Sequence, residues 1–422
     1  MAVENRTLIV GTTSDYIELI ENRYPGQTLF LTDQAERSRV KDQFQIPQLE
    51  LCIDLSNYND VENQLDAFQK KANIKLDGIV CYDDESLLLA SHLAIKNKLP
   101  FPGQKAIELC RDKAASKALW KKAGLSCPDY WIASTPAKDA ENLKGVQFPC
   151  VVKPVCGSGS ELVFLCQTKQ DLKKAISTIR SSEILSQNPR MYGERLDNII
   201  IEEYIMGEEF SCDFAIVANT VQILRTARKV FSEELPVGTS FGYVLPGHLS
   251  ERIQLSTLTK QLKTAAKAVG LERAICMADF IVDDEGGIYL LEITPRMGGD
   301  CLPHILHAAW GIDSIGANLY FSRGQNIEPW LKDTAPSVVG LRLHARETGT
   351  FHSIDFKEFE ADSRFIERHQ IARKGRQIAL PPEDYSSWLL GYVIFQPFAR
   401  QSISTEIQEI LVKNKIKIEN KS

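Results

Sequence analysis

The first hundred residues alternate short apolar runs with amphipathic segments. The apolar runs have the length of buried strands and lie at 7–10, 28–31 and 76–81. The amphipathic segments repeat apolar residues at helical spacing and lie at 14–23, 60–72 and 85–97. Strands that alternate with helices predict a parallel, doubly wound sheet. Gly11 ends the first strand, but the residues after it lack the rest of a dinucleotide-binding fingerprint, so we interpret it as a structural glycine.

Breaks in the pattern predict how the rest of the chain is divided. A Pro-rich run at 99–103 is followed by a helical pattern that begins near 105 and that we expect to form one long helix ending at Gly124. Mixed strands and helices come next, and a strand-rich stretch follows a linker-like segment near 330. The expected units are an α/β domain at 1–104, a mixed domain at 105–325, a strand-rich lobe at 335–405 and a frayed tail at 406–422.

Composition and charge narrow the class of protein. The chain has 422 residues, of which 25% are charged and 44% hydrophobic, and its net charge is -6 with the basic residues scattered. These values are typical of a globular protein, and they argue against a nucleic-acid partner. No run of about 18 apolar residues occurs, so we expect no membrane span. The ten cysteines form no C-x-x-C pair, and a signal-type segment is absent at the start, which together favour reduced thiols and a cytoplasmic location.

A lysine followed by a small-residue loop is the first candidate for chemistry. Lys153 ends an apolar strand, and the loop Gly157, Ser158, Gly159 and Ser160 follows before the next strand. Glycines let backbone N–H groups approach phosphate oxygens, although the Walker pattern is absent. By itself this segment is equally consistent with a plain hairpin that has a flexible tip.

A second candidate is a hairpin that carries two carboxylates. The segment 274–296 predicts two strands joined by a turn at 284–287, and this register places Asp279 opposite Glu292 and Met277 opposite Thr294. Two opposed carboxylates in an apolar hairpin repel each other unless a cation lies between them, and oxygen ligands suit Mg²⁺.

The same register puts Asp279, Glu292 and Thr294 on one face and continues that face with Ile281 and Leu290. The alternative is a solvated outer face that happens to carry two acids. We favour the metal site because the neighbouring residues on that face are apolar.

In their order and separation, these segments resemble the ATP-grasp superfamily. Arg111-Asp112-Lys113 and Lys153 resemble the places where the family's two nucleotide lysines stand, and 201–210 (IEEYIMGEEF) resembles its hinge. The resemblance implies a Rossmann-like preceding domain, then a two-lobed ATP-grasp fold whose small lobe covers about 125–205, and a strand-rich C-terminal lobe. It also implies roles in ATP binding: phosphate contacts for Lys113, Lys153 and the 157–160 loop, adenine contacts for Glu202, Glu203, Tyr204 and Ile205, and a ribose contact for Glu209.

The segment 292–299 (EITPRMGG) is similar to the family's metal motif, E-x-N-x-R. The resemblance assigns Asp279, Glu292 and Thr294 to Mg²⁺, or to Mn²⁺ in its place, but Thr294 stands where most members carry Asn, so the number of ions stays open. Arg296 matches a basic residue that holds the acid substrate. Lys229, in a segment similar to the substrate-facing strand, would neutralise charge on the transferring phosphoryl group.

The resemblance implies an enzyme that activates a carboxylate as an acyl phosphate, passes it to an amine, and releases ADP and phosphate. In layout the chain is similar to L-amino-acid (dipeptide) ligases and to phosphoribosylglycinamide synthetase-like and biotin carboxylase-like enzymes. The partners expected are small-molecule carboxylate and amine substrates, and a homodimer stays open. Activation of bicarbonate, as in biotin carboxylase or carboxyaminoimidazole ribonucleotide synthases, is the first alternative, and it would need a smaller acid pocket. The second is an ATP-binding scaffold or sensor without activity.

Overall fold

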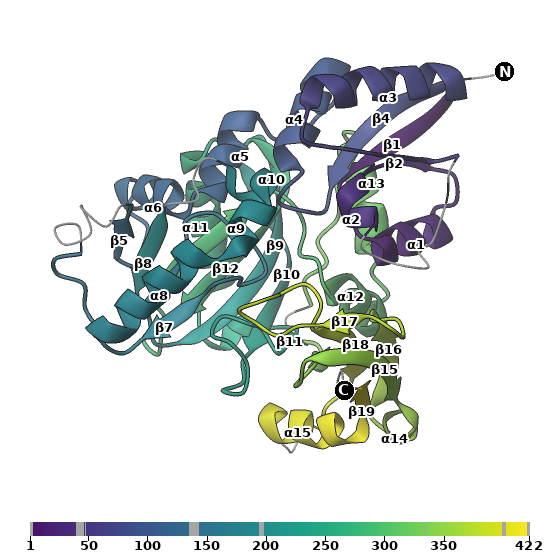
Figure 1. The fold of residues 1–422 in the computed structure, drawn as a ribbon. Helices are drawn as coiled ribbons and strands as arrows, with labels where there is room; N and C mark the ends of the chain where they lie inside the picture. Colours follow the sequence, from purple (N-terminus) through teal and green to yellow (C-terminus); the bar gives the residue numbers. More distant parts are fainter. Residues whose placement is uncertain are drawn as a thin grey trace.

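The structure is a computed structural model that describes residues 3–38, 46, 48–134, 143–193, 198–332, 334–398 and 402–419. It has the mixed α/β and α+β architecture expected from the sequence, with four sheets (Figure 1). They are the N-terminal sheet, a small four-stranded sheet, a large central sheet and a three-stranded sheet that lies near the C-terminus.

The N-terminal sheet is parallel and has the order β3-β2-β1-β4. Its strands are β1 (Glu4–Val10), β2 (Thr28–Asp33), β3 (Glu50–Ile53) and β4 (Ile74–Cys81), and its helices are α1 (Ser14–Arg23), α2 (Gln34–Ser38), α3 (Tyr58–Ala72) and α4 (Leu87–Asn97). Leu8 and Val10 pack in one core with α3 and α4, whereas Ile9 packs in another with α1. Helices thus cover both faces, as predicted for a doubly wound sheet.

The prediction of a single long helix from 105 to Gly124 is wrong. Two helices, α5 (Gln104–Arg111) and α6 (Lys113–Lys122), are separated by Asp112, whose backbone is extended. The Asp112 carboxylate accepts hydrogen bonds from the backbone N–H groups of Ala114 and Ala115, at 3.1 and 2.9 Å. An N-cap inside a continuous helical pattern therefore starts a new helix and points its first residue, Lys113, in a new direction.

The small lobe is an antiparallel sheet with the order β5-β8-β6-β7, covered by short helices. Its strands are β5 (Tyr130–Ala133), β6 (Cys150–Pro154), β7 (Phe164–Cys166) and β8 (Ile199–Glu203), and its helices are α8 (Lys169–Ser181), α9 (Glu183–Gln187) and α10 (Pro189–Tyr192). Apolar residues of α8 and β6 form its separate core.

The central sheet has eight antiparallel strands in the order β13-β12-β9-β10-β11-β14-β18-β16. The strands are β9 (Glu208–Val217), β10 (Thr220–Val230), β11 (Gly242–Leu245), β12 (Arg273–Val282), β13 (Ile288–Thr294), β14 (Val338–His344), β16 (Phe365–Gln370) and β18 (Leu389–Phe395). The helical elements between β11 and β14 are η2 (Leu249–Glu251), α11 (Leu255–Ala268), α12 (Leu302–Trp310) and α13 (Ser314–Ser322). Because β11 pairs with β14, the strand-rich C-terminal segment continues the same sheet.

The expectation of a frayed tail is wrong for the residues up to Glu419. A helix, α15 (Ile403–Lys413), buries Ile407 and Ile410, and β19 (Lys415–Glu419) pairs with β15 (Gly349–Asp355) beside β17 (Gln377–Ile378). The short helix α14 (Lys357–Glu360) contacts α15. Within this polar segment, Glu406 forms a buried ion pair with Arg364, which helps to hold α15 in place.

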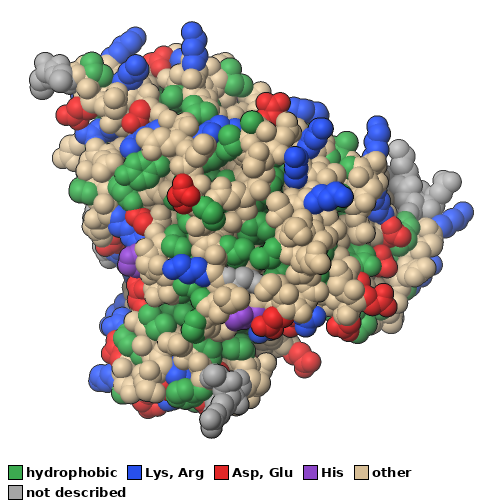
Figure 2. All heavy atoms as spheres, turned by 180° about the vertical axis from the view of Figure 1, so that it is seen from behind, with side chains coloured by type: hydrophobic (Ala, Val, Ile, Leu, Met, Phe, Trp, Pro, Cys, Tyr) green, Lys and Arg blue, Asp and Glu red, His purple; other side chains and the backbone are tan. Residues whose placement is uncertain are grey.

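The surface agrees with the scattered charge of the sequence. On the face that Figure 2 shows, basic and acidic side chains are interspersed. Among the helices that the structure describes, we find none with the length and hydrophobicity needed to cross a membrane. The ten cysteines are free thiols, and all except Cys52 are buried.

Candidate functional site

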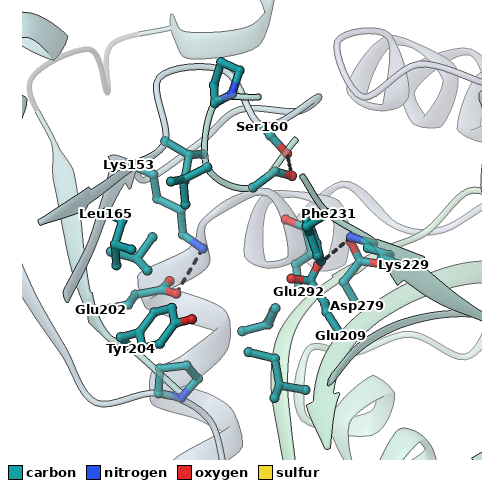
Figure 3. Close-up of a pocket in the computed structure, with 18 of the residues that line it drawn as sticks. Lys153, Ser160, Leu165, Glu202, Tyr204, Glu209, Lys229, Phe231, Asp279 and Glu292 are labelled. Carbon is teal, nitrogen blue, oxygen red and sulfur yellow. Dashed lines mark hydrogen bonds and ion pairs between the residues drawn. The ribbon is translucent and has the colours of Figure 1, made fainter. Parts of the chain in front are cut away.

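Two cavities meet where the small lobe faces the central sheet. The first, here called the interlobe cavity, has a volume of about 750 Å³, and strands of both sheets line it (Figure 3). The second, here called the adjoining cavity, has a volume of about 570 Å³ and extends toward the N-terminal sheet and β18. The two share a wall made of Lys113, Gly157, Ser158, Gly159, Ser160, Lys229, Gly238, Asp279 and Glu292.

A buried charge cluster stands at the small-lobe side of the interlobe cavity. The Glu202 carboxylate, 2% exposed, lies 2.9 Å from the Nζ atom of Lys153 and 2.9 Å from that of Lys117 (Figure 3 shows Lys153). Burial alone would raise the pKa of Glu202, but the two ammonium groups outweigh it and lower the pKa to about 2. The cluster therefore keeps Lys153 pointing into the cavity.

We did not identify Lys117 as a member of this cluster from the sequence. It is fully buried, and its Nζ atom also donates a 2.7 Å hydrogen bond to the carbonyl oxygen of Leu291 on β13. It thus connects α6, the small lobe and the central sheet. Its position one turn after Lys113, on the same face of the helix, is the signal that could have identified it.

Lys113 begins α6 at the shared wall. Its Nζ atom lies 3.4 Å from a carboxylate oxygen of Glu292 and donates a 3.0 Å hydrogen bond to the carbonyl oxygen of Gly157. The small-residue loop is thereby tied to the carboxylate hairpin. The Asp112 cap described above sets this orientation.

The loop 157–160 closes over the shared wall. Gly157 and Gly159 have φ values of 143° and 64°, which favour glycine, and Ser160 has φ 60°. The Ser160 hydroxyl donates a 2.6 Å hydrogen bond to the carbonyl oxygen of Gly238, so the loop is joined across the cavity to the segment between β10 and β11. Apart from its chain neighbours, no heavy atom of the described residues lies within 4 Å of where a Cβ of Gly159 would stand, which leaves its backbone open to a ligand.

The predicted hinge connects β8 to β9. Glu203, Tyr204 and Ile205 line the interlobe cavity, and the Tyr204 side chain is 42% exposed. Gly207 follows with φ 153°, and a Cβ there would stand 2.5 Å from the carbonyl oxygen of Val282. Only glycine fits this close approach, so the strand-to-strand turn is fixed.

The carboxylate hairpin has the predicted pairing at its centre. Asp279 on β12 is opposite Glu292 on β13, Met277 is opposite Thr294, and all four residues line the adjoining cavity. Burial, together with Glu292, raises the pKa of Asp279 to about 6 against the effect of Lys229. Burial alone would raise the pKa of Glu292, but Lys113, Lys153 and Lys229 outweigh it and lower the pKa to about 2.

The prediction that Leu290 continues the Asp279 face is wrong. The register shifts after Asp279, so Phe280 pairs with Leu290 and Leu291 is the extra residue of a bulge. Leu290 is fully buried in the same core as Phe280, whereas Leu291 and Ile281 line the interlobe cavity. Packing of Leu290 against the core explains the shift.

Lys229 lies at the centre of an acidic pocket. Its Nζ atom is 2.5 Å from Asp279 and 2.6 Å from Glu209, which sit on adjacent strands (Figure 3). Burial alone would lower the pKa of Lys229, but these carboxylates raise it well above its usual value. A permanent cation thus stands at the shared wall.

Arg296 lines the adjoining cavity and is held by a residue that we did not single out in the sequence. Its Nε and Nη2 atoms donate to both oxygens of Asp84, at 3.1 and 2.6 Å, and Asp84 follows β4 of the N-terminal sheet. Arg342, paired with Asp300 at 2.8 Å, lines the same cavity. His248, in the turn after β11, is hydrogen-bonded to Ser337 at 2.8 Å and lines neither cavity.

The sequence of this chain is similar to a known domain family and to several known proteins. A family model described as the ATP-grasp domain matches residues 146–304. The uncharacterized protein y4rH of Sinorhizobium fredii is 24% identical over 315 residues, which cover 74% of this chain and 62% of that protein. A D-alanine--D-alanine ligase of Nitratidesulfovibrio vulgaris is 29% identical over 217 residues, 49% of this chain and 64% of the ligase.

This chain therefore spans less than two thirds of the length of these curated relatives. Among solved structures, the L-amino acid ligase from Bacillus licheniformis superposes with a TM-score of 0.76 at 18% identity, covering 100% of both chains. At this level of identity, the similarity shows a shared fold.

Proposed function

We propose that this chain, whose residues 146–304 match the ATP-grasp domain model, is an ATP-dependent carboxylate–amine ligase that forms an acyl phosphate and releases ADP and phosphate. The observation that carries the proposal is the wall shared by the two cavities. A nucleotide in one cavity and an acid in the other would meet there, among lysines and a glycine loop. Such an arrangement suits transfer of a phosphoryl group between two bound molecules.

ATP would occupy the interlobe cavity. Lys113, Lys153 and the loop 157–160 would contact the phosphates, because they supply two ammonium groups and open backbone N–H groups at one end of the cavity. The base would lie between apolar side chains of the two lobes, Val151, Leu165, Ile281 and Leu291. Glu202, Glu203, Tyr204 and Ile205 would contact the adenine, and Glu209 the ribose.

The hairpin residues suit a divalent cation. The Asp279 Oδ1 atom is buried without a hydrogen-bond partner, and the side chain faces Glu292 across the hairpin. Both supply oxygen, the ligand that Mg²⁺ prefers, and the hydroxyl of Thr294 stands on the same face. Mg²⁺, when bound with ATP, would supply neutralisation of the phosphate charge. We therefore assign Asp279, Glu292 and Thr294 to the metal, with Mn²⁺ as a substitute.

The adjoining cavity favours an amino acid or a similar small acid over bicarbonate. Its volume of about 570 Å³ is in the range of sites for larger organic ligands, whereas bicarbonate has only four heavy atoms. Its lining carries both signs of charge, including Asp15, Glu18, Arg373 and Arg376, which suits a zwitterion. Arg296, fixed by Asp84, would hold the carboxylate of the acid.

The proposed reaction needs no nucleophile from the protein. An oxygen of the substrate carboxylate attacks the γ-phosphorus, the bond to the β–γ bridging oxygen breaks, and ADP leaves. The amine then attacks the acyl carbon, phosphate leaves and the amine loses a proton. Lys229 would stabilise negative charge on the transferring phosphoryl group from its place at the shared wall.

The test is a screen for ADP and phosphate release with ATP and Mg²⁺ over amino acids, other small acids and bicarbonate, singly and in pairs. Release that needs an acid and an amine together, with a condensation product by mass spectrometry, supports the proposal. The Lys229→Met variant should be inactive in the same screen. Release of AMP and pyrophosphate would overturn the chemistry, and release with bicarbonate alone as the acid would overturn the substrate class.

A further inference from the structure

Three side chains of types that can ligate a metal lie together outside both cavities. His304 lies on α12, Glu367 and His369 lie on β16, and their ligand atoms are all within 4.8 Å of one another. None of the three lines the interlobe or the adjoining cavity. The proposed ligase reaction therefore does not use them.

The distances are close to those of a metal site. The carboxylate oxygen Oε1 of Glu367 accepts a 2.5 Å hydrogen bond from Nε2 of His369 and lies 4.0 Å from Nδ1 of His304. Ligand atoms around a tetrahedral zinc ion are roughly 3.3 Å apart, given zinc–ligand bonds of about 2.0–2.1 Å. The two observed distances lie on either side of that value, and an ion bound here would replace the hydrogen bond between Glu367 and His369.

The surroundings hold the two imidazoles in place. Their ring centroids are 3.9 Å apart, and Tyr392 of β18 packs against both, at 5.2 Å from His304 and 4.8 Å from His369. His304 is 9% exposed, and Glu367 and His369 are half-buried. Because Glu367 and His369 are two residues apart on a strand, they project from the same face, toward α12.

We propose that His304, Glu367 and His369 form a second metal site, which binds a divalent transition ion such as Zn²⁺ and joins α12 to β16. Two imidazole nitrogens and one carboxylate are a common zinc ligand set, with a water molecule in the fourth position. Mg²⁺ prefers oxygen ligands, so this site differs in chemistry from the Asp279–Glu292 pair.

The site would stabilise a part of the fold that borders the adjoining cavity. β16 is the edge strand of the central sheet and pairs with β18 alone among the described strands. Gln370 and Ile371, directly after His369, line the adjoining cavity. A metal bridge from the edge strand to α12 would therefore hold that wall in position.

The experiment is calorimetric titration of the EDTA-treated and dialysed full chain with Zn²⁺, alongside thermal unfolding with and without Zn²⁺. Wild type should bind Zn²⁺ and melt at a higher temperature with it. His369→Ala removes a ligand nitrogen and Glu367→Gln removes the carboxylate charge, so each should weaken binding by at least the roughly 10–100-fold that loss of a supporting outer residue typically costs. These two residues are half-buried, so their variants test the site even if the buried His304→Ala variant does not fold.

Two controls distinguish this site from other zinc contacts. His92 lies 3.0 Å from Glu62 in a half-exposed pair next to Lys96, so His92→Ala should leave zinc affinity unchanged. The double variant Asp279→Asn with Glu292→Gln should also keep it. The proposal is overturned if folded wild type does not bind Zn²⁺, if His369→Ala binds it as tightly as wild type, or if the Asp279/Glu292 double variant loses it.

Discussion

Replacing Lys117 with methionine removes one of the two cations that hold the Glu202 carboxylate. Both side chains are buried, and the Nζ atom of Lys117 lies 2.9 Å from Glu202 and 2.7 Å from the carbonyl oxygen of Leu291. Methionine nearly fills the same volume, so the change acts mainly on the charge. We expect Lys117→Met to destabilise the fold even though Lys117 contacts no predicted ligand.

The expected magnitude comes from the partners that remain. Breaking a buried ion pair by removing one member costs about 3–5 kcal/mol, because the other charge is left uncompensated. Lys153 stays 2.9 Å from Glu202, so we take the lower end, about 3 kcal/mol. Taking the domain predicted at 105–325 as the cooperative unit, the Tm falls by about 2–4 °C per kcal/mol, so it should drop by roughly 6–12 °C.

The assay is thermal unfolding without nucleotide, and Lys121→Met is the matched control. Lys121 lies one turn later on α6 and pairs with Asp129, but its side chain is 38% exposed. An exposed ion pair contributes at most about 1 kcal/mol, so the Tm of this variant should change little. If Lys117→Met melts within the range of Lys121→Met, the argument that the buried cluster is held by two cations is refuted.

Further predictions concern the metal pair, the acid-binding arginine and a buried histidine. Asp279→Asn and Glu292→Gln should each slow ADP formation severely, and the double variant should be scarcely slower than either, because the two residues serve one metal; multiplying losses would contradict this. Arg296→Ala should raise the KM for the acid and spare ATP affinity, with Asp84→Asn showing a weaker form of the same change; equal loss of both affinities would point to the nucleotide or the fold. Burial lowers the pKa of His344 to about 2, whereas its value in the unfolded chain is near 6.5. Below about pH 6.5 the unfolded state therefore binds a proton that the folded state does not, and the free energy of unfolding falls as the pH drops. Between pH 7 and pH 5 wild type should lose about 2 kcal/mol more than His344→Phe, measured by urea denaturation at each pH; parallel losses would show that His344 is not the cause.

The parallel N-terminal sheet and the centre of the hairpin could be predicted from the sequence. Period-two alternation and the turn at 284–287 were sufficient to pair Asp279 with Glu292 and Met277 with Thr294. Alternating strands and helices likewise predicted the parallel N-terminal sheet. These features depend on residues that are near one another in the chain, so local periodicity and turn preferences determine them.

Only the tertiary structure decided which charged groups meet. Asp84 and Arg296 are 212 positions apart, and Lys117 reaches the carbonyl oxygen of Leu291 across 174. The bulge that moves Leu291 into the interlobe cavity arises because Leu290 packs in the core with Phe280. The burial of α15 likewise depends on a partner, Arg364, far from the helix in sequence. A single sequence carries no record of such distant contacts, because they form only when separate elements pack and exclude water from the groups between them.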